Sequence, residues 1–194
     1  MPKIFTDENK ESLKTELLDI GFEMLKNGGL NAVNIDLLTK KAFIAKGTFY
    51  NLFESKSEYM YHMMIHERNR SKSQLNAHLD DNGNLTNEAL RNYLIWLSHE
   101  NPNVFSYLKE PERKRLLNAW DERYIENEEN DSETMRMLIS LLSTPKDDPD
   151  WRLACNYMKL IAVTLSMKNI FITDNYEDMI LSLIDKIIEC LCKH

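Results

Sequence analysis

The sequence predicts an all-α protein with a three-helix N-terminal head, a larger helical C-terminal body and about nine helices in total. Three observations support this class. Of the 194 residues, 43% are hydrophobic, which is enough for a buried core. Glycine and proline together number only ten. Leucine, methionine and isoleucine recur at helical spacing, whereas the alternation typical of β-strands is scarce.

The first helix is predicted from about residue 8 to residue 27. Gly28 and Gly29 end it, as glycine commonly does just past the C-terminus of a helix. One apolar stripe runs along it, and the next two helices are expected to pack against that stripe. The stripe contains Leu13, Leu17, Ile20 and Met24, with Leu25 beside it.

Two shorter helices follow, at about 35–41 and 45–52, with a tight turn at 42–44 between them. Asn34 is placed to cap the first of the two, because its side chain can accept a hydrogen bond from a free backbone N–H. Their apolar residues fall on facing surfaces, an arrangement typical of a helix-turn-helix. These residues are Ile35, Leu38 and Ala42 on the first, Ile44 in the turn, and Phe49, Leu52 and Phe53 on the second.

A long fourth helix is predicted to start at Ser55, with Glu58 three residues later as the partner in a capping box. Turn-forming residues at 81–84 and 145–149 interrupt the rest of the chain. Further helices are predicted at about 86–99, 103–109, 111–129, 132–143, 150–172 and 175–192.

The charge distribution argues for a local contact with DNA. A net charge of −7 argues against coating of the whole protein by nucleic acid. Residues 1–70 hold ten basic and ten acidic side chains, so the C-terminal part carries the deficit. Between residues 40 and 56, four lysines face only Glu54. A basic patch on an acidic protein predicts contact with DNA at one edge.

The exposed face of the third helix carries residue types that suit DNA. Gly47 lets the backbone approach closely, Thr48 and Tyr50 offer hydroxyl donors to phosphate, and Asn51 can pair with an adenine edge. The alternative is a three-helix core whose outer face is polar without function. The predicted DNA-binding residues are Asn34, Lys46, Gly47, Thr48, Tyr50, Asn51 and Lys56.

The same segment resembles a known family. Leu17–Leu25, Gly29–Ala32 and Lys46–Phe53 with Ser55-Lys56 are similar to the head of TetR-type (tetracycline-repressor-like) transcriptional regulators. The most specific part is the spacing Lys-Gly-Thr-x-Tyr-x-x-Phe-x-x-Lys. The resemblance implies a dimeric all-α regulator whose C-terminal body binds a small ligand. It also implies that Lys46, Thr48, Tyr50 and Lys56 contact phosphate and that Asn51 faces bases.

Three residues depart from the family pattern. Thr39 stands where a small residue is usual, and a bulkier side chain there could push the two helices apart. Phe43 replaces a turn glycine, at a cost of roughly 1 kcal/mol if the turn needs a left-handed backbone. Ala45 replaces a serine cap, at a cost of about 0.5–2 kcal/mol. These departures bear on the angle at which the third helix meets DNA.

The last two predicted helices are apolar on two sides, so each is expected to pack on its own protomer and on a second copy. The alternative is a pair of internal core helices in a monomer. A dimer would place two recognition helices about 34–36 Å apart on successive major grooves. The predicted dimer residues are Leu160, Ile161, Ile180, Leu183, Ile184, Ile187 and Leu191.

A ligand pocket is predicted in the body, because methionine and aromatic side chains adapt to varied apolar shapes. Plain core packing is the alternative for each of them. The candidates are Met63, Tyr93, Trp96, Trp120 and Tyr124. No cofactor or metal is expected. His62 and His66 have metal-compatible spacing but no evident third ligand, and the cysteine pair at 190 and 192 has no second pair to complete a zinc site.

The sequence therefore predicts a sequence-specific DNA-binding transcriptional regulator, most simply a repressor released from its operator by a small molecule. The alternative is a small-molecule-binding helical protein with degenerate DNA recognition. Residues 1–55 would bind double-stranded DNA, and residues 56–194 would bind the effector and a second copy. No nucleophile elbow, phosphate loop or paired serine and histidine predicts an enzyme. No signal peptide or membrane-length apolar run is found, so a cytoplasmic protein without a membrane partner is expected.

Overall fold

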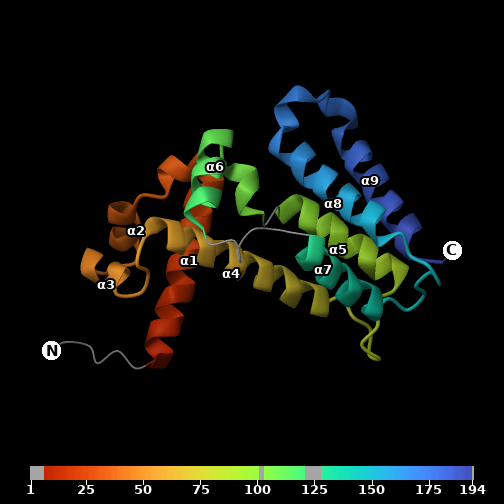
Figure 1. Cartoon of the computed structure of the whole chain (residues 1–194), viewed down its shortest axis with the longest axis horizontal. Coiled ribbons are helices and arrows are strands. Elements are labelled where there is room, and N and C mark those ends of the chain that lie inside the picture. The colour runs from red at the N-terminus through yellow and green to blue at the C-terminus, as the bar shows by residue number, and fades with distance from the viewer. Residues whose placement is uncertain (1–6, 101–102, 121–127, 194) are drawn as a thin grey trace. The chain divides into compact units, whose positions relative to one another are not determined.

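The computed structural model describes residues 7–100, 103–120 and 128–193. These ranges contain α-helices, short 3-10 turns and isolated bridges but no β-strand, which confirms the predicted all-α class. Figure 1 labels the α-helices of the described residues. They are α1 (Asp7–Ala32), α2 (Ile35–Lys41), α3 (Lys46–Tyr50), α4 (Lys56–Asn76), α5 (Asn87–Glu100), α6 (Glu110–Ala119), α7 (Glu128–Leu141), α8 (Trp151–Ser166) and α9 (Tyr176–Leu191).

The chain forms two compact units. Unit 1 contains α1, α2, α3, most of α4, the 3-10 helix η1 (Val104–Tyr107) and α6. Unit 2 contains the end of α4 together with α5, α7, α8 and α9. The division by function at residue 55 stays a prediction. By packing, the first part of α4 and residues 103–120 belong with the predicted head.

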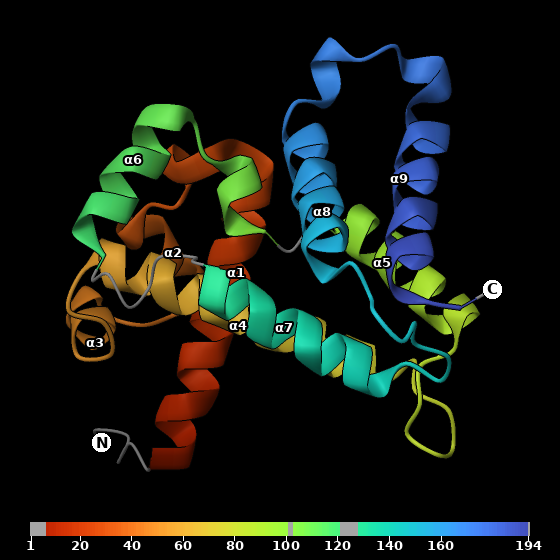
Figure 2. The same cartoon turned by 45° about the vertical axis from the view of Figure 1, so that its right-hand side comes forward.

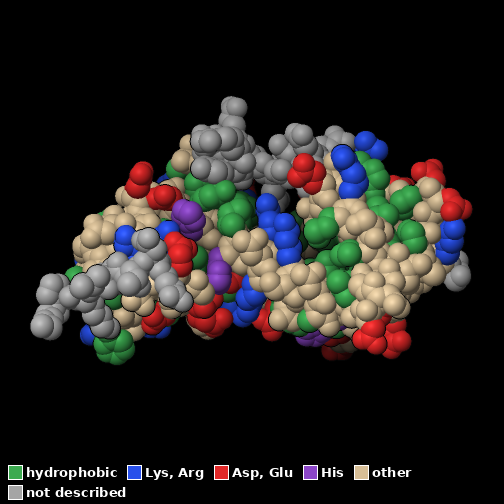
Figure 3. All heavy atoms as spheres, turned by 90° about the horizontal axis from the view of Figure 1, so that it is seen from below, with side chains coloured by type: hydrophobic (Ala, Val, Ile, Leu, Met, Phe, Trp, Pro, Cys, Tyr) green, Lys and Arg blue, Asp and Glu red, His purple; other side chains and the backbone are tan. Residues whose placement is uncertain are grey.

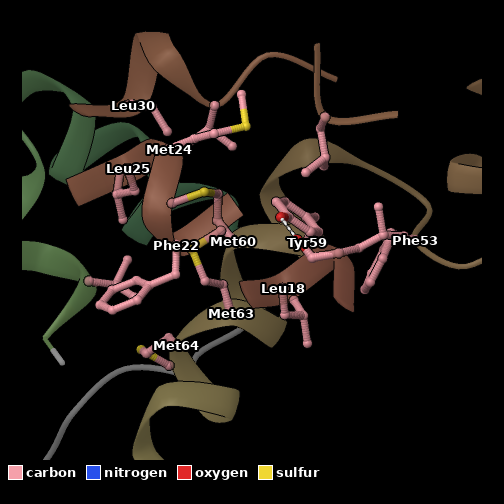
Figure 4. Packing of buried hydrophobic residues seen from close by; sticks show 14 of the residues in the cluster. Leu18, Phe22, Met24, Leu25, Leu30, Phe53, Tyr59, Met60, Met63 and Met64 are labelled. Atoms are coloured by element: carbon pink, nitrogen blue, oxygen red, sulfur yellow. Dashed lines mark hydrogen bonds between the residues drawn. The ribbon is translucent and has the colours of Figure 1, made fainter. Parts of the chain in front are cut away.

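The centre of unit 1 is the contact between α1 and Tyr59 of α4 (Figure 4). The Tyr59 side chain is fully buried, and its hydroxyl donates a hydrogen bond of 2.5 Å to the backbone carbonyl of Leu17. The two helices approach so closely that a Cβ on Gly21 would lie 1.7 Å from the Tyr59 hydroxyl oxygen. Gly21 is therefore required by packing, because the tyrosine occupies the space of its missing side chain.

The kink in α1 falls where glycine was predicted to end the first helix. Gly28 and Gly29 have non-helical backbone angles, and Gly29 has φ +68°, a conformation that glycine adopts without steric cost. A short helical segment continues from there to Ala32. The turn redirects the chain from the long helix toward α2.

Residues 104–120 pack on the head, which the sequence did not indicate. The rings of Phe22 and Tyr107 meet edge to face, with centroids 5.9 Å apart. The indole N–H of Trp120 donates to the Ser57 carbonyl at 2.9 Å. These contacts join η1 to α1, and the end of α6 to the start of α4. Each depends on residues distant in sequence, so local patterns carry no signal for it.

The start of α4 is capped much as predicted. The Ser55 hydroxyl accepts a hydrogen bond from the Glu58 N–H at 3.0 Å. The Glu58 carboxylate accepts from the N–H of Glu54. The bond expected between Glu58 and the Ser55 N–H is thus made one residue earlier. The sharp bend between α3 and α4 is fixed by these side chains.

Unit 2 is built on the antiparallel pair α8 and α9, which lie side by side (Figure 2). Helix α5 packs against α9, where Arg91 forms an ion pair of 2.9 Å with Asp185. Backbone hydrogen bonds join Leu85 to Leu141 at 2.6 Å and Ser143 to Leu85 at 3.0 Å. Helix α8 ends at Ser166 rather than near residue 172, and a 3-10 turn (Lys168–Ile170) follows it.

Among the described residues, no helix is both long enough and apolar enough to cross a membrane.

Replacing Gly21 by alanine is expected to lower the free energy of unfolding by about 1–3 kcal/mol, because the new Cβ collides with Tyr59. Tyr59→Phe removes the hydroxyl and is expected to cost about 1 kcal/mol for the lost hydrogen bond. The double variant should lose less free energy of unfolding than the two single variants lose in sum, since removal of the hydroxyl partly relieves the collision. Urea unfolding of all four proteins measures this coupling, and strictly additive losses would contradict the packing described here.

Candidate nucleic-acid interface

Helix α2 begins as the sequence predicted. The Asn34 side-chain oxygen accepts hydrogen bonds from the backbone N–H groups of Asp36 at 2.8 Å and Leu37 at 3.2 Å. Asn34 is therefore confirmed as the cap of α2. Its side-chain oxygen is used inside the protein, so any DNA contact by Asn34 falls to its remaining polar atoms.

The apolar faces of α2 and α3 meet in the core of unit 1. Phe49 and Phe53 are buried against Tyr59, with ring centroids 5.3 Å and 5.0 Å away. Because α3 has only five residues, these two aromatic side chains hold it in place rather than its own hydrogen bonds. The predicted core residues Ile35, Leu38, Ala42, Ile44 and Leu52 also pack in this cluster.

The turn between α2 and α3 has a left-handed backbone at Phe43, the case in which a cost was expected for replacing glycine. Phe43 has φ +53°, and its side chain is 95% exposed. Thr39 is buried, and its hydroxyl donates to the carbonyl of Ile35 at 2.9 Å. The Thr39 side chain is thus accommodated by a bond within its own helix. Phe43 has no comparable packing to offset its backbone strain.

Helix α3 exposes most of the residues predicted to contact DNA. It is shorter than expected, and Ala45 gives it no side-chain cap. Gly47, Tyr50 and Asn51 are exposed, and Thr48 is half-buried. A Cβ on Gly47 would meet nothing within 4 Å, so the fold itself does not require glycine there. Its absent side chain instead leaves room for a partner close to the backbone.

Lys46 and Lys56 differ in their surroundings. The Lys46 ammonium lies 2.8 Å from the Asp36 carboxylate, and both side chains are mostly exposed. The hydrogen bond and the negative charge of Asp36 raise the pKa of Lys46. No local sequence pattern indicates Asp36, because only the turn between α2 and α3 brings it to Lys46.

The Lys56 ammonium is half-buried and donates to the Leu30 carbonyl at 3.0 Å. Burial lowers the pKa of Lys56, and the positive charge of Arg115 lowers it further. Lys56 therefore links the end of α1 to the start of α4. The sequence predicted only a phosphate contact for Lys56 and gave no sign of this structural role. The exposed lysines of this segment are Lys40 and Lys41 in the last turn of α2, together with Lys46.

Acidic and basic side chains are interspersed on the face of the protein drawn in Figure 3. The basic character of the helix-turn-helix is therefore confined to its few exposed lysines. DNA contact through it would depend on a few lysines and on hydroxyl, amide and backbone groups.

The predicted ligand residues lie in both units. Met63 is fully buried in the core of unit 1, and Trp120 is part of the same core. Tyr93 and Trp96 stack in unit 2 with ring centroids 6.2 Å apart. Burial raises the pKa of Tyr93 to about 12. Tyr124 lies outside the described residues. The four described side chains thus have packing roles, and a pocket that includes them stays a prediction.

Most of the predicted dimer residues lie in the core of unit 2. Ile180, Ile184, Ile187 and Leu191 are at most 2% exposed and form the core of unit 2, and Ile161 is also buried there. These five side chains therefore contribute to the protomer's own core, and a dimer contact through them stays a prediction. Leu183 is half-buried and Leu160 is 47% exposed, so these two remain available.

The described residues include one cluster with metal-compatible atoms. Ligand atoms of Asp19, His66 and Glu67 lie within 4.8 Å of one another. The His66 ring nitrogen is 2.7 Å from the Asp19 carboxylate, which pairs α4 with α1. We assign this contact a structural role. Cys155, Cys190 and Cys192 are free thiols.

No family model matches this sequence, and no curated protein matches it. Solved structures resemble the chain over nearly its whole length. A TetR family transcription regulator from Marinobacter aquaeolei VT8 is 14% identical, with 97% of this chain and 100% of that chain covered and a TM-score of 0.58. A TetR-family transcriptional regulator from Haemophilus influenzae RD is 16% identical, with 95% and 98% covered and a TM-score of 0.54. A TetR-like transcriptional regulator from Rhodococcus sp. RHA1 is 17% identical, with 94% and 97% covered and a TM-score of 0.53. The chain therefore has the fold of the TetR-family regulators.

Replacing Phe43 by glycine is expected to raise the free energy of unfolding by about 1 kcal/mol, because glycine adopts positive φ without strain and an exposed ring contributes no packing. Phe43→Ala keeps the strained backbone and is the matched control, with little expected change. Urea unfolding measures both. An equal gain from alanine would show that the aromatic ring, rather than the backbone, is the source of the cost.

Proposed function

We propose that this chain, which has the fold of the TetR-family transcription regulators, is a transcriptional regulator that binds double-stranded DNA through α2 and α3. The observation that carries the proposal is the two-sided character of α3. Phe49 anchors it in the core, while Gly47 and Tyr50 are exposed on its outer surface and Asn51 is exposed as its C-cap residue. A helix of this kind can enter a major groove without rearrangement of the head.

The roles of these side chains follow from their chemistry. Thr48 and Tyr50 have hydroxyl groups that donate to phosphate oxygens, and the exposed Lys40 and Lys41 add positive charge beside them. Asn51 can donate and accept at an adenine edge. We assign Lys56 to the positioning of α4, because its ammonium already donates a hydrogen bond to the Leu30 carbonyl.

A homodimer formed through α8 fits the exposed apolar surface of unit 2. Leu153, Leu160, Val163 and Met167 are between 41% and 53% exposed. Their spacing of seven, three and four residues places them on one stripe of the helix. An apolar stripe of this length usually marks a protein interface. Two-fold symmetry would then present two copies of α3 to successive major grooves.

Regulation by a small-molecule effector completes the proposal. A ligand bound in the C-terminal body would favour a dimer whose heads are wrongly spaced for the operator, and so release a repressor from DNA. It could act only through its difference in affinity for the two dimer states. Such a protein would work in the cytoplasm, beside the DNA.

One observation favours a second candidate, a ligand-binding protein with weak DNA recognition. Two of the lysines predicted to contact phosphate are already engaged, Lys46 with Asp36 and Lys56 with Leu30. Fewer free cations mean weaker nonspecific attraction to DNA. Direct DNA binding decides between the two candidates.

Selection of duplexes from a random library is expected to enrich one palindromic sequence. Replacing Lys40 and Lys41 by alanine should weaken binding to all duplexes about equally and flatten its dependence on salt, because phosphate contacts are lost. Lys72→Ala, at an exposed position on α4, is the control. Asn51→Ala should instead reduce the preference at one base pair by about 1–3 kcal/mol. Failure to enrich any sequence would contradict specific DNA binding and favour the second candidate.

Val163→Asp is expected to convert the dimer into monomers, because a charge would be buried in the apolar interface. Light scattering should then give a mass near the 22.9 kDa of one chain rather than about twice that value. Ser140→Asp, at an exposed site on α7, is the control and should leave the dimer intact. A wild-type monomer at micromolar concentration would contradict the assigned interface.

A further inference from the structure

The ion pair between Asp36 and Lys46 lies on the surface proposed to face DNA. Asp36 is in the first turn of α2, and Lys46 is the first residue of α3. Their charged groups are 2.8 Å apart, and the Asp36 and Lys46 side chains are 68% and 53% exposed. The pair therefore presents a positive and a negative group side by side to the solvent.

The fold gains little from this pair. Exposed ion pairs typically contribute at most about 1 kcal/mol to stability. For DNA binding the carboxylate is a disadvantage, since it repels phosphate and neutralises a lysine. An acidic side chain at this position is useful if it accepts a hydrogen bond from a base, because bases are the part of DNA that offers neutral N–H donors.

A G·C base pair matches the ion pair in chemistry and in spacing. In the major groove guanine presents two acceptors, N7 and O6, next to the N4 amino group of cytosine. O6 and N4 are hydrogen-bonded to each other, so they lie about 2.9 Å apart. The Lys46 ammonium and the Asp36 carboxylate are a donor and an acceptor 2.8 Å apart, which is nearly the same separation.

We propose that Asp36 and Lys46 together read one G·C base pair of the operator. Lys46 donates to guanine O6 and N7, and Asp36 accepts from the cytosine amino group. An A·T pair offers a donor and an acceptor at the same separation, adenine N6 and thymine O4, but suits them less well, because the ammonium then has one acceptor beside a methyl group rather than guanine O6 and N7 together. This inference rests on the proposed function, and it makes Asp36 a specificity-determining residue.

The backbone at Asp36 is held in place by the cap of α2. The Asn34 side chain accepts from the Asp36 N–H at 2.8 Å, and so fixes the first turn of α2. Lys46 is at the N-terminal end of α3, where residues of a recognition helix reach base edges. Asn34 would thus contribute to DNA recognition as a positioning residue.

The test compares wild-type protein with Asp36→Ala on the selected duplex, on duplexes substituted at each position, and on random duplexes. We expect Asp36→Ala to lower affinity for the selected duplex roughly 5- to 150-fold, the range of one base-specific contact. The preference for one G·C pair should disappear, while random duplexes should bind equally well or more tightly, since a negative charge has been removed. Asp36→Asn keeps an acceptor oxygen and should lose less.

The opposite sign of effect would overturn the inference. If Asp36→Ala binds every duplex more tightly and keeps the wild-type preference at each position, the carboxylate acts only as an unfavourable charge. Glu54→Ala removes another exposed carboxylate of the same segment, and is expected to leave all base preferences unchanged. A wild-type protein that selects no sequence would overturn the proposed function as well, and so is distinguishable from failure of the Asp36 assignment alone.

Discussion

The contact between Tyr59 and α1 is the constraint on which the head depends. The tyrosine fills the space left by Gly21, and its hydroxyl is bonded to the Leu17 carbonyl inside the core. The same ring supports Phe49 and Phe53 from the side of α3. The Tyr59 side chain therefore sets the distance between α1 and α4. It also sets the position of α3, the short helix proposed to contact DNA.

The outer surface of α3 is a consequence of that packing. A five-residue helix is too short to be stable alone, so its orientation is determined by the aromatic side chains beneath it. What it exposes is more balanced in charge than a simple basic patch. Lys46 is paired with Asp36, and Lys56 is bonded to backbone, so recognition would depend on hydrogen-bonding geometry more than on the number of cations.

In unit 2, the two apolar sides of the last helices have separate uses. The main apolar stripe of helix α9 packs in the protomer's own core, where Ile184 and Ile187 are fully buried. Helix α8 leaves Leu160 and Val163 exposed. The sequence showed that both helices had more apolar surface than one contact needs. It could not show which stripe faces inward, because that depends on how α5 and α9 pack on α8.

The sequence by itself determined the elements whose causes are local. The bounds of α2 and its Asn34 cap follow from interactions within four residues, which a linear pattern records, whereas the positive φ at Phe43 is not recorded by the residue that stands there. Tertiary structure decided the partners of Gly21, Lys46 and Lys56. Their partners lie between ten and 38 positions away along the chain, so only packing brings them together and sets which charges stay free.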